Sequence, residues 1–475
     1  MSKLLFSHSY FYRFDPKQWK AHQPYPPLAT IQAAACLREA GHDVALFDTN
    51  MRAHAMEVVD ALKKHQPHYF IIYDDGFNYL TKMCLTNMRA AACEMAREAR
   101  RLNCVVIVNS SDASDRYEHY LDNGVDYVVR GEGEETLKYL VHALDTDADV
   151  NKIEGIAFRK AGQAVVTPAR AVLRDLDSLP MPAWDLVDID MYKKVWRDKH
   201  GYFSMNIATT RGCPFKCNWC AKPIYGNRYN SRSPGHVISE IEFLLKNYGP
   251  DHFWMCDDIF GLKPGWIQSF RKLVKSRGLS FKYKIQSRVD LLLQEDTIDA
   301  LAESGAQTVW VGAESGSQKI LDAMDKGTTT AQIEEATLLL RKKKIRVGFF
   351  LQFGYPGETR EDIDKTIDMV LNLMPDEIGV SVSYPLPGTK FYEKVKDQLS
   401  IKQNWSDSDD LSMMYQGAYP AEFYKILHRY VHNRYGIRRG LKSSSFRHVA
   451  ALALHIPMAA VRGYRMKNIY RSHAR

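Results

Sequence analysis

Short apolar runs alternate with longer amphipathic stretches through the first third of the chain. Short runs bounded by polar residues are typical of strands in a parallel sheet, and apolar positions recurring every three or four residues predict helices between them. This alternation predicts an α/β, doubly wound, Rossmann-like domain over residues 1–148. The expected strands are Lys3–Ser7, Asp43–Asp48, Tyr69–Tyr73, Cys104–Val108 and Tyr127–Arg130, and the expected helices are Leu28–Ala40, His54–Lys64, Tyr79–Arg101, Asp115–Asn123 and Glu134–Leu144.

A connection and then a second α/β repeat follow. Ile153–Arg159 and Ala164–Thr167 flank a turn, and Leu179–Trp184 is rich in proline, so 149–200 is expected to form a hairpin and an extended linker. Six strand-then-helix units over 201–400 indicate a partial (βα)6 barrel of the TIM type, with its chemistry on the loops after the strands. The six strands are expected at Met205–Thr209, His252–Cys256, Phe281–Gln286, Gln307–Val311, Arg346–Phe353 and Glu377–Ser383.

The last region, 401–475, is expected to be helical and basic. Residues 421–475 hold twelve Lys or Arg and one acidic residue, a net charge of +11 that leaves −3 for the rest of the +8 chain. Because the body is slightly acidic, the basic balance does not indicate a nucleic-acid partner. Two interpretations of this region stay open: a helical cap over the open barrel, which we favour, and an interfacial helix that touches a membrane surface.

The composition is that of an ordinary globular protein of two to three domains, with 475 residues, 45% of them hydrophobic. The start of the chain reads as a strand rather than a signal peptide, and the apolar run Val449–Val461 is too short to span a bilayer. We therefore expect a cytoplasmic protein, with membrane association left open.

Three of the eight cysteines are clustered directly after the first expected barrel strand. Cys213, Cys217 and Cys220 have the spacing CxxxCxxC, and three thiolates this close can surround one metal centre. Three ligands leave one iron of a cubane cluster without a protein ligand, and an open position is typical of a catalytic site. A zinc site is disfavoured because no fourth ligand lies nearby at zinc-finger spacing. The five other cysteines are expected to be small buried hydrophobic residues.

CxxxCxxC with an aromatic residue, Trp219, before the last cysteine resembles the signature of the radical S-adenosylmethionine (SAM) superfamily. The resemblance implies a [4Fe-4S] cluster on Cys213, Cys217 and Cys220 whose free iron binds the amino and carboxylate groups of SAM. Electron transfer would then cleave SAM to a 5′-deoxyadenosyl radical, with the protein binding, orienting and excluding water.

Polar or glycine-containing elements follow the later strands in the order that the resemblance implies. Asp257 and Asp258, after the second strand, would receive the SAM amino group, the alternative being a helix cap. Ser287 and Arg288 end the third strand, where an arginine could pair with the SAM carboxylate or form only a surface salt bridge.

The fourth and fifth strands end in two further elements of this kind. Glu314 lies in a GxESG-like stretch and would accept a hydrogen bond from SAM. Gly354 and Pro356 lie in the element that the resemblance places beside the adenine.

The two-domain order as a whole resembles the radical SAM enzymes that carry a cobalamin-binding domain, which include methyltransferases and the anaerobic magnesium-protoporphyrin ester cyclase. It implies cobalamin contacts at Asn109, Ser110, Ser111, Gly131 and Glu132. There are two departures from the usual pattern. The DxHxxG motif is absent, as is common within this subgroup, where cobalamin binds without a protein histidine. Residues 109–114 also lack the glycine pair and histidine usual after the fourth strand, and this departure is the one that stands against cobalamin. Asp74 and Asp75 after the third strand are unusually acidic, and a solvated loop is the alternative reading there.

The leading hypothesis is a radical SAM enzyme that modifies an unactivated carbon of a small-molecule or lipid-like substrate by cobalamin-dependent methylation. It would take electrons from a donor such as flavodoxin or ferredoxin. The alternative is cyclisation, rearrangement or oxidation without methyl transfer, with a cobalamin-free N-terminal domain. A non-catalytic iron–sulfur sensor or scaffold is a third class, disfavoured because the SAM elements are all present.

Overall fold

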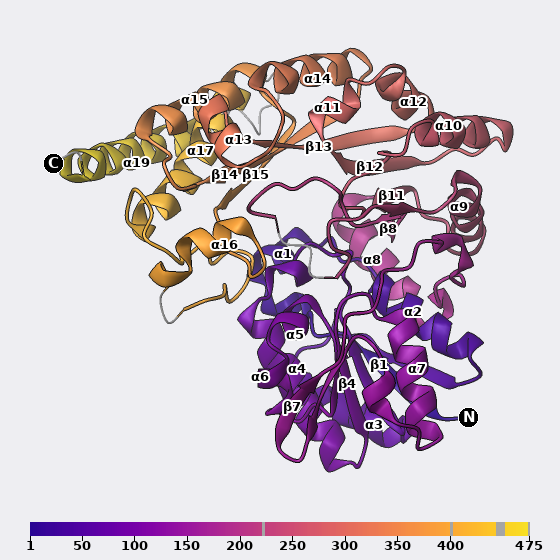
Figure 1. Ribbon diagram of the computed structural model, residues 1–475. Helices are drawn as coiled ribbons and strands as arrows, with labels where there is room; N and C mark the ends of the chain where they lie inside the picture. Colours follow the sequence, from indigo (N-terminus) through magenta and orange to yellow (C-terminus); the bar gives the residue numbers. More distant parts are fainter. Residues whose placement is uncertain (221–223, 400–401, 443–451, 474–475) are drawn as a thin grey trace.

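The computed structural model describes residues 1–475 apart from 221–223, 400–401, 443–451 and 474–475 (Figure 1). The N-terminal part is a seven-stranded sheet in the order β2-β1-β3-β4-β5-β6-β7, whose first five strands are parallel. These strands are β1 Lys3–Ser7, β2 Asp43–Phe47, β3 Tyr69–Tyr73, β4 Val105–Asn109 and β5 Tyr127–Val129. The order and direction confirm the doubly wound α/β prediction.

Helices cover both faces of this sheet, as its strands require, because successive side chains of a buried strand point to opposite faces. Leu4 and Ile71 pack on the side of α2 and α7, whereas Leu5 and Phe70 pack on the side of α3 and α4. The helices are α1 Pro16–Ala21, α2 Leu28–Glu39, α3 Val58–His65, α4 Thr86–Arg101, α5 Ser111–Asp115, α6 Tyr117–Leu121 and α7 Glu134–Asp145.

The predicted hairpin forms, and it joins the N-terminal sheet. β6 Ile156–Lys160 pairs antiparallel with β5, and β7 Gln163–Val166 forms the outer edge. The linker then continues to α8 Ile189–His200, whose Trp196 donates a hydrogen bond to the carbonyl of Pro24.

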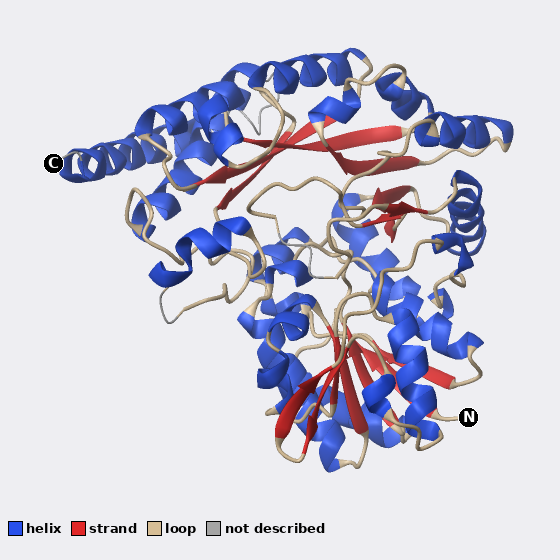
Figure 2. Cartoon of the chain, viewed as in Figure 1, coloured by secondary structure: helices blue, strands red, loops and turns tan. Residues whose placement is uncertain are grey.

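The second sheet has six parallel strands in the order β15-β14-β13-β12-β11-β8, with its two ends left open, as the partial barrel predicts (Figure 2). Its strands are β8 Ser204–Ile207, β11 His252–Met255, β12 Lys282–Ser287, β13 Ala306–Glu314, β14 Arg346–Phe353 and β15 Glu377–Val382. Its helices are α9 Pro234–Tyr248, α10 Trp266–Ser276, α11 Val289–Leu292, α12 Thr297–Glu303, α13 Gln318–Ala323, α14 Thr330–Lys342, α15 Arg360–Leu373 and α16 Lys390–Val395.

The C-terminal region differs from the helical prediction in its first part. Residues 402–420 contain no helix or strand and cross back to the N-terminal domain, where Thr86 N–H donates to the carbonyl of Trp405 and Ser408 bonds to Asp15. Only then do two long helices follow, α17 Ala421–Lys442 and α19 Leu452–His473. They pack against each other, and α17 also contacts α15 and β15.

Candidate functional site

A cavity of about 430 Å³ lies where the two domains meet, at the carboxyl ends of the barrel strands. A volume of this size is typical of a small-molecule site. Its wall comes from three distant parts of the chain: the barrel strand ends, the N-terminal residues Phe77, Tyr79, Lys82 and Met83, and the C-terminal residues Trp405, Ser408 and Leu411.

The three clustered cysteines all face this cavity and are half-buried. Across the described residues no three His, Cys, Asp or Glu side chains gather round a single point as the ligands of one ion would. The thiols of Cys213, Cys217 and Cys220 instead share the cavity wall. Thiolate donors with free space in front of them fit an iron–sulfur cluster that keeps one iron open.

A short ladder closes the base of the cysteine loop. β9 Thr210–Arg211 pairs antiparallel with β10 Asn230–Ser231. This pairing holds the two ends of the loop that contains the cysteines next to each other. Gly212 has φ +76°, and a side chain there would overlap the carbonyl of Arg228. Only glycine therefore allows the chain to turn into the first cysteine.

Asp257 holds this loop from below. Its fully buried carboxylate accepts from the backbone N–H of Thr209 (2.6 Å) and of Thr210 (2.8 Å), and from the Thr209 hydroxyl (2.6 Å). Burial raises the pKa of Asp257 to about 6, although these hydrogen bonds oppose the rise. Asp257 lines the cavity, and its oxygens accept hydrogen bonds from the protein, so in this structure it positions the cysteine loop.

Arg288 also lines the cavity and is engaged. Its guanidinium pairs with Asp290 (3.0 Å), donates to the carbonyl of Lys326 (2.9 Å) and lies 3.8 Å above the Phe215 ring. Its Nη1 is 3.9 Å from Cys217 Sγ. The guanidinium is buried and its ion pair is with a partly exposed Asp290, and the side chain also contacts the cysteine loop through Phe215.

Glu314 ends β13 with an unusual backbone. Its φ of +55° is in the left-handed region, beside a register shift in the pairing with β14. Its Oε1 accepts from Lys326 Nζ at 2.8 Å, and both side chains are buried against the cavity. Burial alone would lower the pKa of Lys326, but the nearby Glu314 and Cys217 have the larger combined effect, so its pKa is raised. A side chain at Gly312 would displace the ends of both side chains of this pair. Ser287 completes this polar end of the cavity.

Asp258 is paired across the domain boundary. Its carboxylate accepts from Lys82 Nζ of the N-terminal domain, and both residues line the cavity. Lys82 is thus a site residue that the sequence analysis missed, because no local pattern marks a partner 176 residues away.

Gly354 and Pro356 are not among the lining residues, which differs from their expected place beside SAM. Their strand contributes Phe350, Leu351 and Gln352 instead. Gly354 N–H donates to Glu358 Oε2 (2.6 Å), and its carbonyl accepts from the Tyr415 hydroxyl. The turn at Gly354 is therefore held by hydrogen bonds within the protein, one of them from Tyr415 of the C-terminal region. Trp219 does line the cavity, and its indole N–H is buried without a partner among the described residues.

Glu358 predicts a measurable dependence of stability on pH. Burial raises its pKa to about 8, whereas the unfolded side chain titrates near 4.5. Between these values the folded state holds the extra proton, so this group lowers stability as pH rises from about 4.5 to 8, by up to about 1.4 kcal/mol per unit. Glu358→Gln should therefore stabilise the protein by a few kcal/mol at pH 8 and much less at pH 5, measured by urea unfolding.

The matched control is Glu361→Gln, an exposed change in the first turn of α15, the helix that begins two residues after Glu358. Equal changes in unfolding free energy at pH 5 and pH 8 for Glu358→Gln would show that the buried carboxyl is already ionised.

A flat aromatic floor faces the cavity from inside the barrel. Trp310 and Phe350 stack with their ring centroids 4.7 Å apart. Trp310 of β13 lies against Gly348 of the neighbouring β14 and Gly379 of β15 beyond it, and a methyl group at Gly348 would overlap the indole. The sequence analysis missed this floor because its members belong to three strands.

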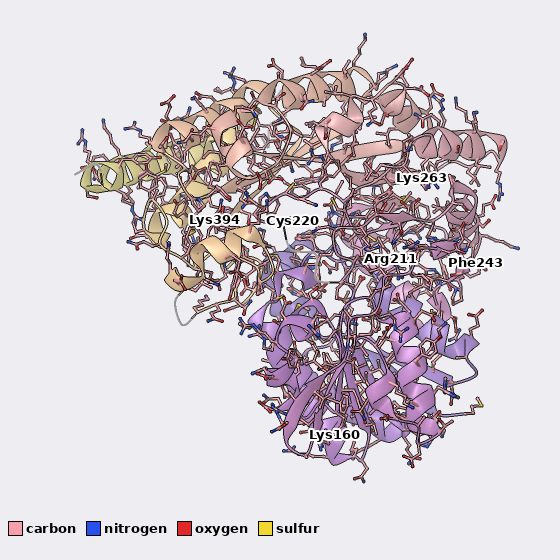
Figure 3. All side chains as sticks on the ribbon, viewed as in Figure 1. Lys160, Arg211, Cys220, Phe243, Lys263 and Lys394 are labelled. Carbon is pink, nitrogen blue, oxygen red and sulfur yellow. The ribbon has the colours of Figure 1, made fainter. Side chains whose placement is uncertain are left out.

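A buried ion-pair cluster joins the cysteine loop to the N-terminal domain. Arg211, two residues before Cys213, pairs with Glu132 at 2.5 Å and with Glu134 at 2.7 Å, and lies over the rings of Phe77 and Tyr225. Figure 3 shows the labelled Arg211 and Cys220 near the boundary between the two domains. Glu132, predicted as a cobalamin contact, is instead committed to this cluster and to the Leu173 N–H.

The other residues expected to contact cobalamin lie around a narrow crevice at the carboxyl edge of the N-terminal sheet. Asn109, Ser110 and Ser111 line it, and Ile224 and Tyr225 of the barrel domain close it. Asn109 Nδ2 donates to the carbonyls of Val129 and Gly131, and Ser110 caps α5.

The acidic loop beside the crevice is not solvated, so that reading of Asp74 and Asp75 is wrong. Asp74 accepts from the N–H and hydroxyl of Ser9, and burial raises its pKa to about 6. Asp75 accepts from the N–H groups of Ala29 and Phe77. The Ser111 hydroxyl is buried without a hydrogen-bond partner among the described residues. The crevice thus offers a free polar group, but it has no room for a ligand until its walls separate.

Comparisons with known proteins agree with this site. A family model for the radical SAM superfamily matches residues 207–370. An uncharacterized methyltransferase of Pyrococcus horikoshii is 30% identical over 388 residues, covering 80% of this chain and 81% of that protein. The anaerobic magnesium-protoporphyrin IX monomethyl ester cyclase of Synechocystis sp. is 27% identical over 373 residues, covering 77% of this chain and 72% of that protein.

A solved structure shares the fold over nearly the whole chain. The cobalamin-dependent S-adenosylmethionine radical enzyme OxsB, with aqua-cobalamin and S-adenosylmethionine bound, superposes with a TM-score of 0.73 at 16% identity, covering 98% of this chain and 71% of that chain. One assignment follows from three observations: the order of the two domains, the cysteine motif after the first barrel strand, and the similarity to the relative from Pyrococcus horikoshii. The chain is an enzyme of the radical SAM superfamily.

Proposed function

We propose that this enzyme transfers a methyl group, with cobalamin as a second cofactor, to an unactivated carbon of an apolar small-molecule or lipid-like substrate. The observation that carries the proposal is the shared cavity, in which the cluster thiols, the polar end around Glu314 and a wall from the N-terminal domain face one space. Flavodoxin or ferredoxin is the class of electron donor that we propose.

In this superfamily the reduced cluster supplies the electron that cleaves SAM to methionine and a 5′-deoxyadenosyl radical. The side chains that line the cavity would position the cluster and SAM for this reaction. Cys213, Cys217 and Cys220 would hold the cluster, and the Glu314–Lys326 pair presents a carboxylate and an ammonium group suited to the zwitterionic end of SAM. The apolar walls keep water from the reactive carbon.

Cobalamin would lie between the cavity and the crevice of the N-terminal domain, and would supply the methyl group. Ser110, Ser111 and Asn109 offer hydroxyl and amide groups suited to its amide-bearing edge, and Phe77 and Met83 offer apolar contacts. Because the crevice is closed here, entry requires the segment 76–83 to separate from Tyr225.

The lining of the cavity supports an apolar substrate with a flat or extended body. Besides the Trp310–Phe350 floor, side chains from the barrel and the C-terminal segment are largely apolar: Val380, Val382, Tyr384, Leu386, Trp405 and Leu411. A few polar groups, including Gln286 and Ser381, would orient the bound molecule.

Gly348→Ala should disturb this floor without reaching the cluster. The added methyl pushes the Trp310 indole into the cavity, and overpacking of this kind costs about 1–3 kcal/mol. We expect lower thermal stability and weaker substrate turnover, with the cluster content and substrate-free SAM cleavage retained. The control is Gly235→Ala, near the start of α9, where a methyl group meets only Ser233 Oγ at 4.0 Å. Equal behaviour of the two variants would count against the floor as a substrate surface.

The central experiment is anaerobic reconstitution of the cluster, followed by addition of SAM, a reductant and hydroxocobalamin. We expect retained corrinoid together with both 5′-deoxyadenosine and S-adenosylhomocysteine among the products. A fully loaded cluster that yields neither product from SAM would overturn the proposal.

The second candidate is cyclisation, rearrangement or oxidation without methyl transfer. It is favoured by the similarity to the Synechocystis ester cyclase and by the closed crevice. The same experiment separates the two, since this candidate predicts 5′-deoxyadenosine without S-adenosylhomocysteine.

A further inference from the structure

We propose that the hairpin of α17 and α19 docks this enzyme on an anionic lipid surface. Figure 1 shows α19 running outward, with the C-terminal end projecting beyond the body of the protein. The side of α19 that packs on α17 is built for that contact: Met466 and Tyr470 are buried, and Gly463 lies against the Tyr430 ring. The opposite side is exposed.

That outer side carries large apolar side chains in water. Leu454 is 62%, Val461 60% and Tyr464 68% exposed. Leu454 and Val461 are seven residues apart and Tyr464 follows after three, so they share one helix face. An exposed apolar stripe on a surface helix marks an interaction site, because burying it is favourable.

Basic residues flank the stripe at both ends. Lys467 and Arg471 continue the same face toward the C-terminus and are exposed, at three and seven residues after Tyr464. Arg438 and Arg439 are exposed near the end of α17, level with the start of α19, since Gly436 lies against His455. Apolar residues that insert and basic residues that meet headgroups are the two features of an interfacial helix.

The charge of this region favours an anionic lipid surface as the partner of the exposed face of α19. Residues 421–475 carry a net charge of +11, whereas the rest of the chain carries −3, so a second copy would bring like charge to this face. Two arginines of α19 are used within the hairpin: Arg465 pairs with Glu422 of α17, and Arg462 donates to Asn433 Oδ1. No helix among the described residues has the length and hydropathy of a membrane span, so docking would be peripheral.

The test is co-sedimentation of the full-length protein with vesicles of phosphatidylcholine alone and with added phosphatidylglycerol. We expect binding to the anionic vesicles that weakens with salt. The variant Leu454→Gln/Val461→Gln/Tyr464→Ser should reduce it by roughly tenfold or more, and Lys467→Gln/Arg471→Gln should reduce it only on anionic vesicles. The control is Leu338→Gln, which alters a 54% exposed leucine on α14.

Circular dichroism and the melting temperature establish that each variant folds. Equal binding to neutral and anionic vesicles, or a triple variant that binds as well as Leu338→Gln, would overturn the proposal. The proposal would also be overturned if the protein bound neither kind of vesicle and light scattering showed a dimer that is lost in the triple variant.

Discussion

Replacing Cys217 by alanine should abolish the formation of 5′-deoxyadenosine and lower the iron and sulfide content of the reconstituted protein. Cys217 lies in the middle of the CxxxCxxC loop, faces the cavity and is touched by Arg288. Without its thiolate a second iron loses its protein ligand, and a cluster held by two cysteines is not expected to persist. Iron and sulfide analysis and the electron paramagnetic resonance spectrum of the reduced protein measure the loss.

Cys256→Ala is the matched control, because Cys256 lines the same cavity but is not part of the motif. It is fully buried, and its thiol donates to the carbonyl of Ile207 at 3.3 Å. Its removal should cost about 1 kcal/mol of stability and leave the cluster in place. A Cys256→Ala protein without iron, or a Cys217→Ala protein with a full cluster, would contradict the ligand assignment.

Arg211→Met should cause the largest loss of stability, of about 3–5 kcal/mol, because it leaves Glu132 and Glu134 buried side by side without a cation. Their side chains are only 9% and 2% exposed. Arg211 is also adjacent to the glycine that begins the cysteine loop, so iron loading should fall as the loop loses its anchor. Chemical denaturation followed by circular dichroism measures the first effect, and iron analysis the second.

Two further variants separate charge from packing. Arg277→Met removes an exposed ion pair with Glu242 and should change stability by less than about 1 kcal/mol. Combining Arg211→Met with Glu132→Gln and Glu134→Gln should recover part of the loss, because the uncompensated charges are gone. If Arg211→Met destabilised no more than Arg277→Met, the buried cluster would not hold the two domains together.

The amino-acid pattern predicts the strands of both sheets to within a few residues. Parallel strands buried on both faces are continuous apolar runs, and Tyr69–Tyr73 and Arg346–Phe353 are found where the pattern places them. The helix expected over Tyr79–Arg101 begins only at Thr86, because Cys84 before it has a left-handed backbone, with φ +53°, through which a helix cannot continue. The site also depends on contacts that no local pattern contains.

The side chains around the cysteines illustrate that limit. Asp257 and Arg288 are polar residues at strand ends, and the sequence alone presents both as ligand contacts. In the folded protein one binds the backbone under the cysteine loop and the other stacks on Phe215. Trp405 comes from a stretch with no periodic pattern, yet it lines the cavity. These partners lie far apart in the sequence, so only the tertiary structure brings them together.

The cavity wall supplied by Trp405, Ser408 and Leu411 has a consequence for biosynthesis. A nascent chain that has left the ribosome as far as residue 395 already contains all three cluster cysteines and all six barrel strands. It still lacks the last wall, because 402–420 has not yet crossed back to Asp15 and Thr86. The site is therefore more open in such a nascent chain than in the finished protein, where the end of the chain closes one side of the cavity.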